Sequence, residues 1–424
     1  MREYRLPSGL GVLLLRDPAA PIVAYQTWFR VGSRHEQPGR TGLAHLFEHL
    51  MFNETERLKP GEFDRRLESI GADTNAATWL DWTYYRDNVP AAHLEVVVEL
   101  EAERMAHLVL HEPQLETERG VVSNERRQRV DDDVDGFLGE ELYRLAYQQH
   151  PYRWPTIGWM EDIQAITLED ARAFYRTWYA PNNATLVLVG DFEEAAALAM
   201  IERHYGGLAP QAIPVEQRVV EPEQVAERRV EFERPVMSDR LLLGWRAVGI
   251  ADEDHAALEI AAELLCNGQS SSVYKRLVID TEVASSVTAE VPGFRDPGLL
   301  EIRASLQRGH AAEEAERIIV EEIARLAAHP VPAELLEKGK NRLEARFFRH
   351  LRPHEGKAEA LGHHQTTAGD FRLLFRAAEH IRAVTPEGLQ RAIARYLSPR
   401  RCNVVVARPP RPARSARAGR KAAT

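Results

Sequence analysis

The sequence predicts an α+β fold with two similar halves, because part of it repeats after half the chain. Residues 166–191 align with residues 384–409 without a gap, at a constant offset of 218 positions in a chain of 424. The alignment pairs Thr167 with Thr385. Each copy has the pattern of a capped helix, a turn that contains proline, and a strand. A repeat at this distance indicates two homologous units.

Both halves combine predicted strands with predicted helices. The predicted strands are 10–15, 22–31 and 184–189 in the first half and 240–246 and 299–305 in the second. Residues 206–227 contain Pro210, Pro214 and Pro222 and have the composition of a linker. The expected domain organisation is a first domain at 1–208, a linker at 209–228, a second domain at 229–407 and a basic disordered tail at 408–424.

The composition is that of a large globular enzyme. Hydrophobic residues make up 44% of the chain, and the formal net charge of −10 gives no reason to expect nucleic-acid binding. The two cysteines, Cys266 and Cys402, predict no disulfide framework. No apolar run is long enough for a membrane span, and the run at 10–15 is too short for a signal peptide. We therefore expect a cytoplasmic protein, or a periplasmic one if the true N-terminus carries an export signal.

The most informative motif is His45-Leu46-Phe47-Glu48-His49. On a helix, both imidazoles leave the same face one turn apart and can bind one Zn²⁺ at about 2.0–2.1 Å. Glu48 lies beside His49 and can reach a water at the metal without being a ligand. This order inverts His-Glu-x-x-His, and both orders occur in zinc peptidases. A chance match is expected in roughly one sequence in twenty of this length, so the motif needs support.

A catalytic zinc site usually takes three protein ligands, so a third must come from elsewhere in the chain. The segment 116–125 supplies candidates, because its residues Glu118, Val121, Val122 and Glu125 follow the spacing of one helical face. Two carboxylates on the same face as two valines are expected to point inward, where an unpaired charge is costly. A metal would satisfy the polar groups of both segments.

With Glu125 placed 76 positions after His49, this arrangement resembles the signature of the pitrilysin or insulinase (M16) metallopeptidases. Further stretches that resemble the family are 71–76, 118–122, 150–152 and 155–158. The resemblance extends to about residue 408. It implies two homologous α/β-sandwich halves, of the LuxS/MPP-like metallohydrolase type, that are joined by a linker and face each other around a chamber.

The resemblance also implies a role for each residue of the motif. His45, His49 and Glu125 would bind one Zn²⁺ per chain. Glu48 would activate the water, and Glu118 would match the second acidic position of the family, which orients the site from behind the ligands.

Asn75 and Ala76 match the strand that, in the family, pairs with the backbone of the substrate, so that main-chain hydrogen bonds give the affinity. The alternative for Asn75 is a plain strand-end residue. A nearby aromatic cluster is expected to pack in a core rather than to contact substrate, and it consists of Trp79, Trp82, Tyr84 and Tyr85. Three histidines without metal-site spacing are expected to lie on a polar helix face, namely His354, His363 and His364.

The second half lacks the metal ligands and departs from the family at one further site. Members that act alone or as homodimers usually carry an Arg and a Tyr there, seven residues apart, which contact the substrate or the transition state. The matching positions hold Val278 and Ser285, which cannot stabilise an oxyanion as Arg and Tyr do. We therefore expect the zinc-bearing subunit of a heterodimer whose partner subunit supplies the Arg/Tyr pair. The alternatives are a homodimer or single chain that stabilises the oxyanion with other donors, or a different register of the alignment at Val278 and Ser285.

The predicted function is that of a zinc-dependent endopeptidase acting on peptides or unfolded polypeptide segments. The alternative is a non-catalytic structural or assembly subunit of the same fold, but such a subunit would be marked by loss of a zinc ligand or of Glu48, and none is lost. A metal-storage or metal-sensing protein would not need Glu48 beside His49.

Overall fold

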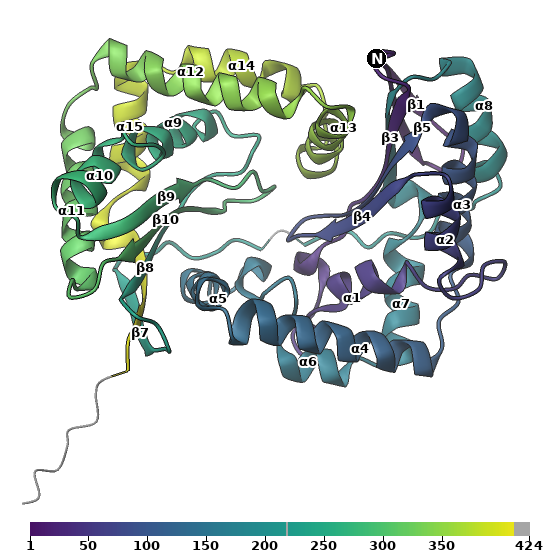
Figure 1. The fold of residues 1–424 in the computed structure, drawn as a ribbon, viewed down its shortest axis with the longest axis horizontal. Coiled ribbons are helices and arrows are strands. Elements are labelled where there is room, and N and C mark those ends of the chain that lie inside the picture. Colours follow the sequence, from purple (N-terminus) through teal and green to yellow (C-terminus); the bar gives the residue numbers. More distant parts are fainter. Residues whose placement is uncertain (218, 411–424) are drawn as a thin grey trace, which may run out of the picture.

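Two β-sheets form the centre of the molecule, one in each half of the chain (Figure 1). The structure is a computed structural model that describes residues 1–217 and 219–410. The strand order is β1-β2-β6-β3-β5-β4 in the first sheet and β7-β11-β8-β10-β9 in the second. In each sheet one pair is parallel, β2 with β6 and β7 with β11, and the other neighbours are antiparallel. The second sheet therefore repeats the first, which has β1 as an additional edge strand.

The helices occur in the same order along the chain in both halves, so α1 to α7 correspond to α9 to α15. The strands are β1 Arg2–Arg5, β2 Gly11–Arg16, β3 Ile22–Phe29, β4 Asp73–Thr78, β5 Thr83–Pro90, β6 Ala184–Gly190, β7 Arg228–Glu233, β8 Arg240–Arg246, β9 Ala284–Glu290, β10 Leu299–Leu306 and β11 Cys402–Arg408. The helices of the first half are α1 Leu43–Leu50, α2 Glu62–Ser69, α3 Leu94–His107, α4 Glu112–Arg126, α5 Val134–Ala146, α6 Met160–Ala165, α7 Leu168–Trp178 and α8 Glu194–Tyr205. Those of the second half are α9 His255–Leu265, α10 Ser272–Tyr274, α11 Ala312–Ala328, α12 Ala333–His350, α13 His354–His363, α14 Leu373–Ala383 and α15 Pro386–Tyr396.

The repeat predicted from the sequence is present in the structure. Helices α7 and α15 begin 218 residues apart, and so do the strands β6 and β11 that follow them. Both helices start at a threonine: the Thr167 side chain accepts a hydrogen bond from the backbone N–H of Asp170, and the Thr385 side chain accepts one from Gly388. Such caps satisfy N–H groups that have no partner within the helix. The prediction of an α+β fold with two similar halves is confirmed.

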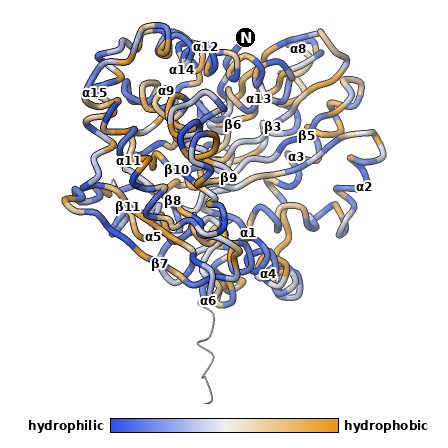
Figure 2. The backbone as a smooth tube through the Cα atoms, turned by 60° about the vertical axis from the view of Figure 1, so that its left-hand side comes forward, coloured by the Kyte–Doolittle hydropathy of each residue, from blue (hydrophilic) through white to orange (hydrophobic). Residues whose placement is uncertain are grey.

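Each sheet is covered on both faces because side chains alternate along its buried strands. In β3, Val23, Tyr25 and Phe29 join the core that contains residues of α1, α3, α7 and α8, whereas Ala24 and Trp28 belong to a cluster on the opposite face. Residues of α9, α11 and α15 form the corresponding core of the second half. Hydrophobic and hydrophilic residues alternate along most helices, as expected where one helix face is buried (Figure 2).

The remaining face of each sheet is covered by a helix from the other half (Figure 1). Helix α13, from the second half, packs on β3 and β6, where Leu361 lies in one cluster with Trp28. Helix α5, from the first half, packs on β8 and β11, where Leu142 lies in one cluster with Val405. Because these corresponding helices are exchanged, each half completes its packing with a helix from the other.

The exchange explains why one expectation from the sequence is wrong. The predicted polar helix face of His354, His363 and His364 lies on α13 and just beyond it, between the two halves. His354 is buried, and the other two are half-buried. The His363 ring packs edge-on against Trp28 and Trp82, at centroid distances of 6.4 and 6.2 Å. Burial lowers the pKa of His363 to about 3, so its ring is neutral.

The segment that joins the halves has no regular secondary structure, but two of its carboxylates bind it to the rest of the molecule. Apart from residue 218, which is not described, residues 206–227 contain no helix or strand. The Glu221 carboxylate accepts hydrogen bonds of 2.7–2.8 Å from the backbone N–H groups of residues 148–150. The Glu216 carboxylate contacts His35 of the first half at 3.0 Å and Arg295 of the second half at 2.5 Å.

The second sheet extends one residue beyond each expected limit of its domain. Strand β7 begins at Arg228, and β11 ends at Arg408, which forms ion pairs of 2.9 Å with Glu231 and Asp239. Of the expected tail at 408–424, residues 411–424 lie outside the described residues. Strand β1, which the sequence did not predict, pairs with β2. None of the described helices combines the length and the apolar composition of a bilayer-spanning segment.

Candidate metal centre

Helix α1 carries His45, Glu48 and His49, and the chain fixes where this helix begins. Gly42 adopts a φ of 94°, and a Cβ at this position would lie 2.7 Å from the Ile157 carbonyl oxygen, so only glycine fits. The buried Glu36 carboxylate accepts hydrogen bonds from the backbone N–H groups of Gly42 (2.8 Å) and Ala44 (2.7 Å). A carboxylate at this end satisfies free N–H groups and complements the helix dipole.

Helix α4 packs against α1 and brings Glu125 to the two histidines. The Glu125 Oε2 atom lies 3.6 Å from His45 Nε2 and 3.3 Å from His49 Nε2. These three residues form the one group within residues 1–217 and 219–410 whose ligand atoms all lie within 4.8 Å of one another. Ligand atoms bound at about 2.0–2.2 Å in a tetrahedron are roughly 3.3–3.5 Å apart, so the donor set fits Zn²⁺. The three residues expected from the sequence to bind zinc are therefore brought together.

Glu118 lies behind His49, as the sequence suggested. Its Oε2 atom is 3.6 Å from His49 Nδ1, the ring nitrogen that faces away from Glu125. Its other oxygen accepts a 3.0 Å hydrogen bond from Asn53 Nδ2. A carboxylate at this place fixes the orientation of a ligating imidazole.

The helical face predicted for α4 is only partly correct. Val122 is buried against α1, but Val121 is 44% exposed and does not point inward. The sequence analysis also missed two contacts, although helical spacing could have revealed both. Arg129, four residues after Glu125, forms an ion pair with its Oε1 at 3.0 Å, and Asn53, which donates a hydrogen bond to Glu118, lies four residues after His49.

The two histidines have opposite protonation preferences in the absence of a metal. Burial lowers the pKa of His45 to about 4, so this ring is neutral at pH 7. Burial also opposes the charged form of His49, but the Glu118 and Glu125 carboxylates outweigh it and raise the pKa of His49 to about 9. A metal ion needs neutral imidazoles, so its binding would release the His49 proton.

Glu48 stands apart from the three converging side chains. No ion pair to its carboxylate is found among the described residues, and burial raises its pKa. The Thr78 side chain, at the end of β4, lies near this carboxylate and favours its ionised form, which partly offsets the rise of the pKa. The contact joins residues 30 positions apart on different elements, so no local signal in the sequence could have indicated it.

Strand β4 also carries Asn75 and Ala76, and it is the edge strand of the first sheet next to the metal centre. Asn75 is exposed and Ala76 is half-buried. One side of the strand pairs with β5, and its other side has no partner strand among the described residues. The expectation of a strand at these positions is correct.

A cavity of about 360 Å³ adjoins the metal centre and is lined by both halves. His45, Thr78 and Arg129 lie on its border with the metal centre, and Glu290 and Glu301 from β9 and β10 lie on the side of the second half. Ligand sites are commonly concave and partly apolar, and this cavity satisfies both conditions.

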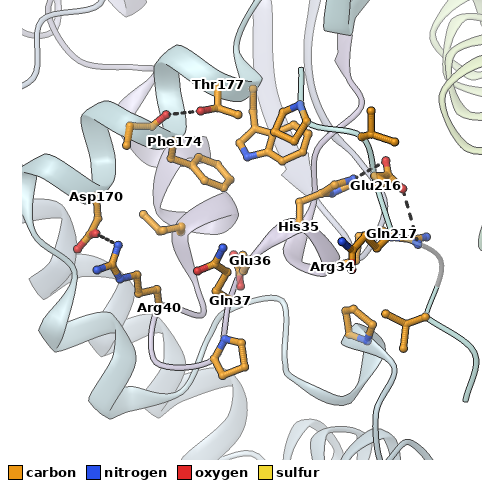
Figure 3. A pocket seen from close by; sticks show the side chains of 18 residues that line it. Arg34, His35, Glu36, Gln37, Arg40, Asp170, Phe174, Thr177, Glu216 and Gln217 are labelled. Carbon is orange, nitrogen blue, oxygen red and sulfur yellow. Dashed lines mark hydrogen bonds and ion pairs between the residues drawn. The ribbon is translucent and has the colours of Figure 1, made fainter. Parts of the chain in front are cut away.

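A larger cavity of about 780 Å³ is lined by residues before and at the start of α1, by α7 and by the linker, and it is not part of the metal centre (Figure 3). Several of its polar side chains contact one another: His35 contacts Glu216 at 3.0 Å, and Arg40 forms an ion pair with Asp170. It contains none of the predicted zinc ligands.

Comparison with known proteins places these observations in a family. Residues 11–158 match the model described as insulinase (peptidase family M16), and residues 165–343 match the model described as peptidase M16 inactive domain. The zinc protease PqqE of Helicobacter pylori is 32% identical over 350 residues, which are 82% of this chain and 79% of that protein. The beta subunit of mitochondrial-processing peptidase from Lentinula edodes is 24% identical over 92% of this chain and 86% of that protein.

The fold is shared with a solved protease. The crystal structure of a protease from Helicobacter pylori superimposes with a TM-score of 0.92 and 29% identity, over 96% of this chain and 99% of that one. The sequence and structure matches extend across both halves, including the helices and strands that carry the candidate metal centre. The chain therefore belongs to the M16 family of peptidases.

Proposed function

We propose that this chain is a zinc-dependent endopeptidase whose first half holds one Zn²⁺ through His45, His49 and Glu125. The observation that carries the proposal is the convergence of three ligand atoms from α1 and α4 within 4.8 Å. Relatives named zinc proteases support it at the level of the family. A bound Zn²⁺ would supply a Lewis acid that makes water more acidic and polarises the scissile carbonyl group.

Glu48 is the general base and acid in this proposal. Its carboxylate takes the proton from the attacking water and later gives it to the leaving amine. Burial raises the pKa of Glu48 above its usual value, and the nearby Thr78 side chain opposes part of this rise. Glu118 and Asn53 hold His49 in place, and they take no part in proton transfer.

The edge of β4 would bind the substrate as an added strand. Along Asn75 and Ala76, the backbone groups of β4 that point away from β5 can hydrogen-bond to an extended peptide next to the metal centre. Because such contacts involve only the main chain, they suit peptides and unfolded segments of many sequences.

A second subunit would complete the site. At the positions of the family's Arg/Tyr pair, Val278 is half-buried against the core of the second half, and the exposed Ser285 donates its hydroxyl to the Ser305 carbonyl oxygen at 3.1 Å. Neither side chain offers a cation or a phenol to an oxyanion. A relative named as a subunit of mitochondrial-processing peptidase supports a paired assembly.

The test is hydrolysis of a quenched-fluorescent peptide pool by the purified chain, after its zinc content has been measured. Cleavage should fall by roughly 10²–10⁴-fold in Glu48→Gln while the zinc content stays unchanged, because only proton transfer is removed. The exposed Glu68→Gln is the matched control and should keep full activity.

The outcome also separates the two versions of the proposal. Zinc without cleavage, followed by cleavage when a subunit with the Arg/Tyr pair is added, would identify a half-enzyme. Strong cleavage by the isolated chain would reject the need for a partner. A purified chain that binds no zinc would contradict the proposal as a whole.

A further inference from the structure

Two carboxylates lie opposite each other in the cavity beside the metal centre. Glu301 on β10 and Glu290 on β9 are direct cross-strand neighbours and face the same side of the second sheet. Like charges in directly opposed positions destabilise a sheet. Their presence therefore needs a reason other than the stability of the fold.

Glu301 is nearly buried and has no cationic partner. Its exposed fraction is 7%, and no Lys, Arg or His of the described chain forms an ion pair with it. The Tyr143 hydroxyl of α5 approaches the carboxylate but carries no charge. Burial and the charge of Glu290 raise the pKa of Glu301 to about 7, although Tyr143 and the more distant Arg303 favour its ionised form.

The other charged residues of the cavity are engaged elsewhere. Arg129 binds Glu125 at 3.0 Å, and Arg303 donates to the Asp135 backbone oxygen at 3.0 Å. Glu140, the third carboxylate of the cavity, is paired with Arg126. The negative charge of Glu301 and Glu290 therefore remains directed at the cavity.

The walls between these carboxylates and the metal centre are aromatic. Trp79, 47% exposed, lies 6.4 Å from Phe294 between ring centroids, and Phe294 lies 6.5 Å from Tyr143. Aromatic faces bind both the aliphatic stem of a long side chain and a cationic head group. A cavity with such walls and anions at one side suits a Lys or Arg side chain.

The cavity is placed to receive a side chain from a peptide on β4. Thr78, the last residue of β4, and Trp79, just after the strand, line it within three residues of Ala76, and His45 lies on its border. Successive side chains of an added strand point to opposite faces, so every second one would face this cavity.

We propose that this cavity is a recognition subsite for a Lys or Arg side chain of the substrate, with Glu301 and Glu290 as the acceptors of its charged N–H groups. The proposal rests on the proposed peptidase function for its substrate, but it concerns binding and can be tested without turnover.

The test measures binding of fluorescent peptides to the zinc-loaded Glu48→Gln chain. A single Lys is moved along an otherwise neutral sequence, and each peptide is compared with the one that has norleucine at the same place. At one position the Lys peptide should bind at least about 10-fold more tightly, as expected for hydrogen bonds to a charged group. Adding Glu301→Gln should reduce the difference to about 2-fold or less, and Glu290→Gln should reduce it partly.

The exposed Glu334→Gln is the matched control and should keep the full preference for Lys. The ratio of the two affinities should also rise with pH between about 6 and 8, since the ionised carboxylate is the form that binds a cation. The zinc ligands affect both peptides alike and cancel in this ratio.

Equal affinity for Lys and norleucine at every position, or a preference that survives Glu301→Gln, would overturn the subsite. Absence of any peptide binding would overturn it as well. The proposed function is decided separately, because cleavage of the neutral peptides by the chain with intact Glu48 does not depend on this cavity.

Discussion

The helix pairs α1/α4 and α9/α12 occupy equivalent places in the two halves, but different groups connect them. In the first half, His45 and His49 on α1 converge on Glu125 on α4. In the second half, the buried Glu263 on α9 contacts Arg342 at 3.3 Å and Arg346 at 2.5 Å on α12. The first helix pair offers a ligand set for a metal, whereas ion pairs join the two helices of the second.

This difference shows that the scaffold and the chemistry are separable. Both halves place a helix pair beside a sheet whose outer strand, β4 or β9, faces the cavity between them. In the first half, this helix pair carries the candidate metal centre. The second half instead contributes carboxylates to the adjoining cavity. Substitutions confined to one half test whether the other half responds.

The largest effect is expected from removing a ligand in the first half. Glu125→Gln should lower the zinc content from about one to well below one per chain, because an amide is a poor zinc ligand. Peptidase activity should fall on the order of 10³-fold, equivalent to the several kcal/mol that a metal provides to the transition state. Metal analysis by mass spectrometry and peptide hydrolysis measure the two losses.

The second half supplies the control. Glu263→Gln removes a carboxylate from the equivalent helix pair and should leave one zinc per chain. If Glu125→Gln retained full zinc, the ligand set would be different from the proposed one. If Glu263→Gln lost zinc, the two helix pairs would be coupled, and the separation of scaffold and chemistry would be wrong.

A smaller effect is expected for Glu118→Gln. This carboxylate contacts His49 Nδ1 at 3.6 Å but is not one of the converging ligands. Loss of such a supporting group typically costs 10–100-fold in metal affinity or activity. Zinc competition with a chelator measures the change, and the exposed Glu116→Gln on the same helix is the control. An unchanged zinc affinity would remove Glu118 from the site.

The parts of this comparison that the sequence predicts are those determined by local patterns. The spacing within 45–49 predicts a helix with two histidines on one face, and α1 is such a helix. The strand predicted at 240–246 has the same limits as β8. The repeat of 218 residues predicts the equivalent positions of α7 and α15, because each copy contains its own cap, proline and apolar periodicity within a short segment.

What the sequence could not predict depends on long-range packing. The exchange of α5 and α13 buries His354 and largely buries His363, although the sequence around them predicts a polar helix face. Trp79 was expected in a core with its aromatic neighbours, but it is 47% exposed and lines the cavity. That Glu301 forms no ion pair with a described residue is visible only when α5, β9 and β10 are assembled.

The ion pairs of the second half should affect stability rather than chemistry. Glu263→Gln should lower the free energy of unfolding by about 1–2 kcal/mol, because a buried acceptor of charged hydrogen bonds is lost. The loss stays modest because Arg342 and Arg346 are 37% and 53% exposed and regain water. Urea unfolding measures it, with the exposed Glu387→Gln as the control. A loss of activity without a loss of stability would contradict this assignment.

The smallest effect is expected where the linker joins the halves. Glu216 contacts His35 of the first half and Arg295 of the second, and although burial alone would raise its pKa, these partners lower it to about 2. A carboxyl with a lowered folded-state pKa stabilises the protein above its unfolded value of about 4.5, and the contribution is lost as the pH falls toward 2. Glu216→Gln should therefore be less stable by on the order of 1 kcal/mol at pH 7. The difference from the unaltered chain in urea unfolding should stay constant from pH 8 to about 5 and shrink below that. A difference that grows as the pH falls would mean that Glu216 does not connect the halves through its charge.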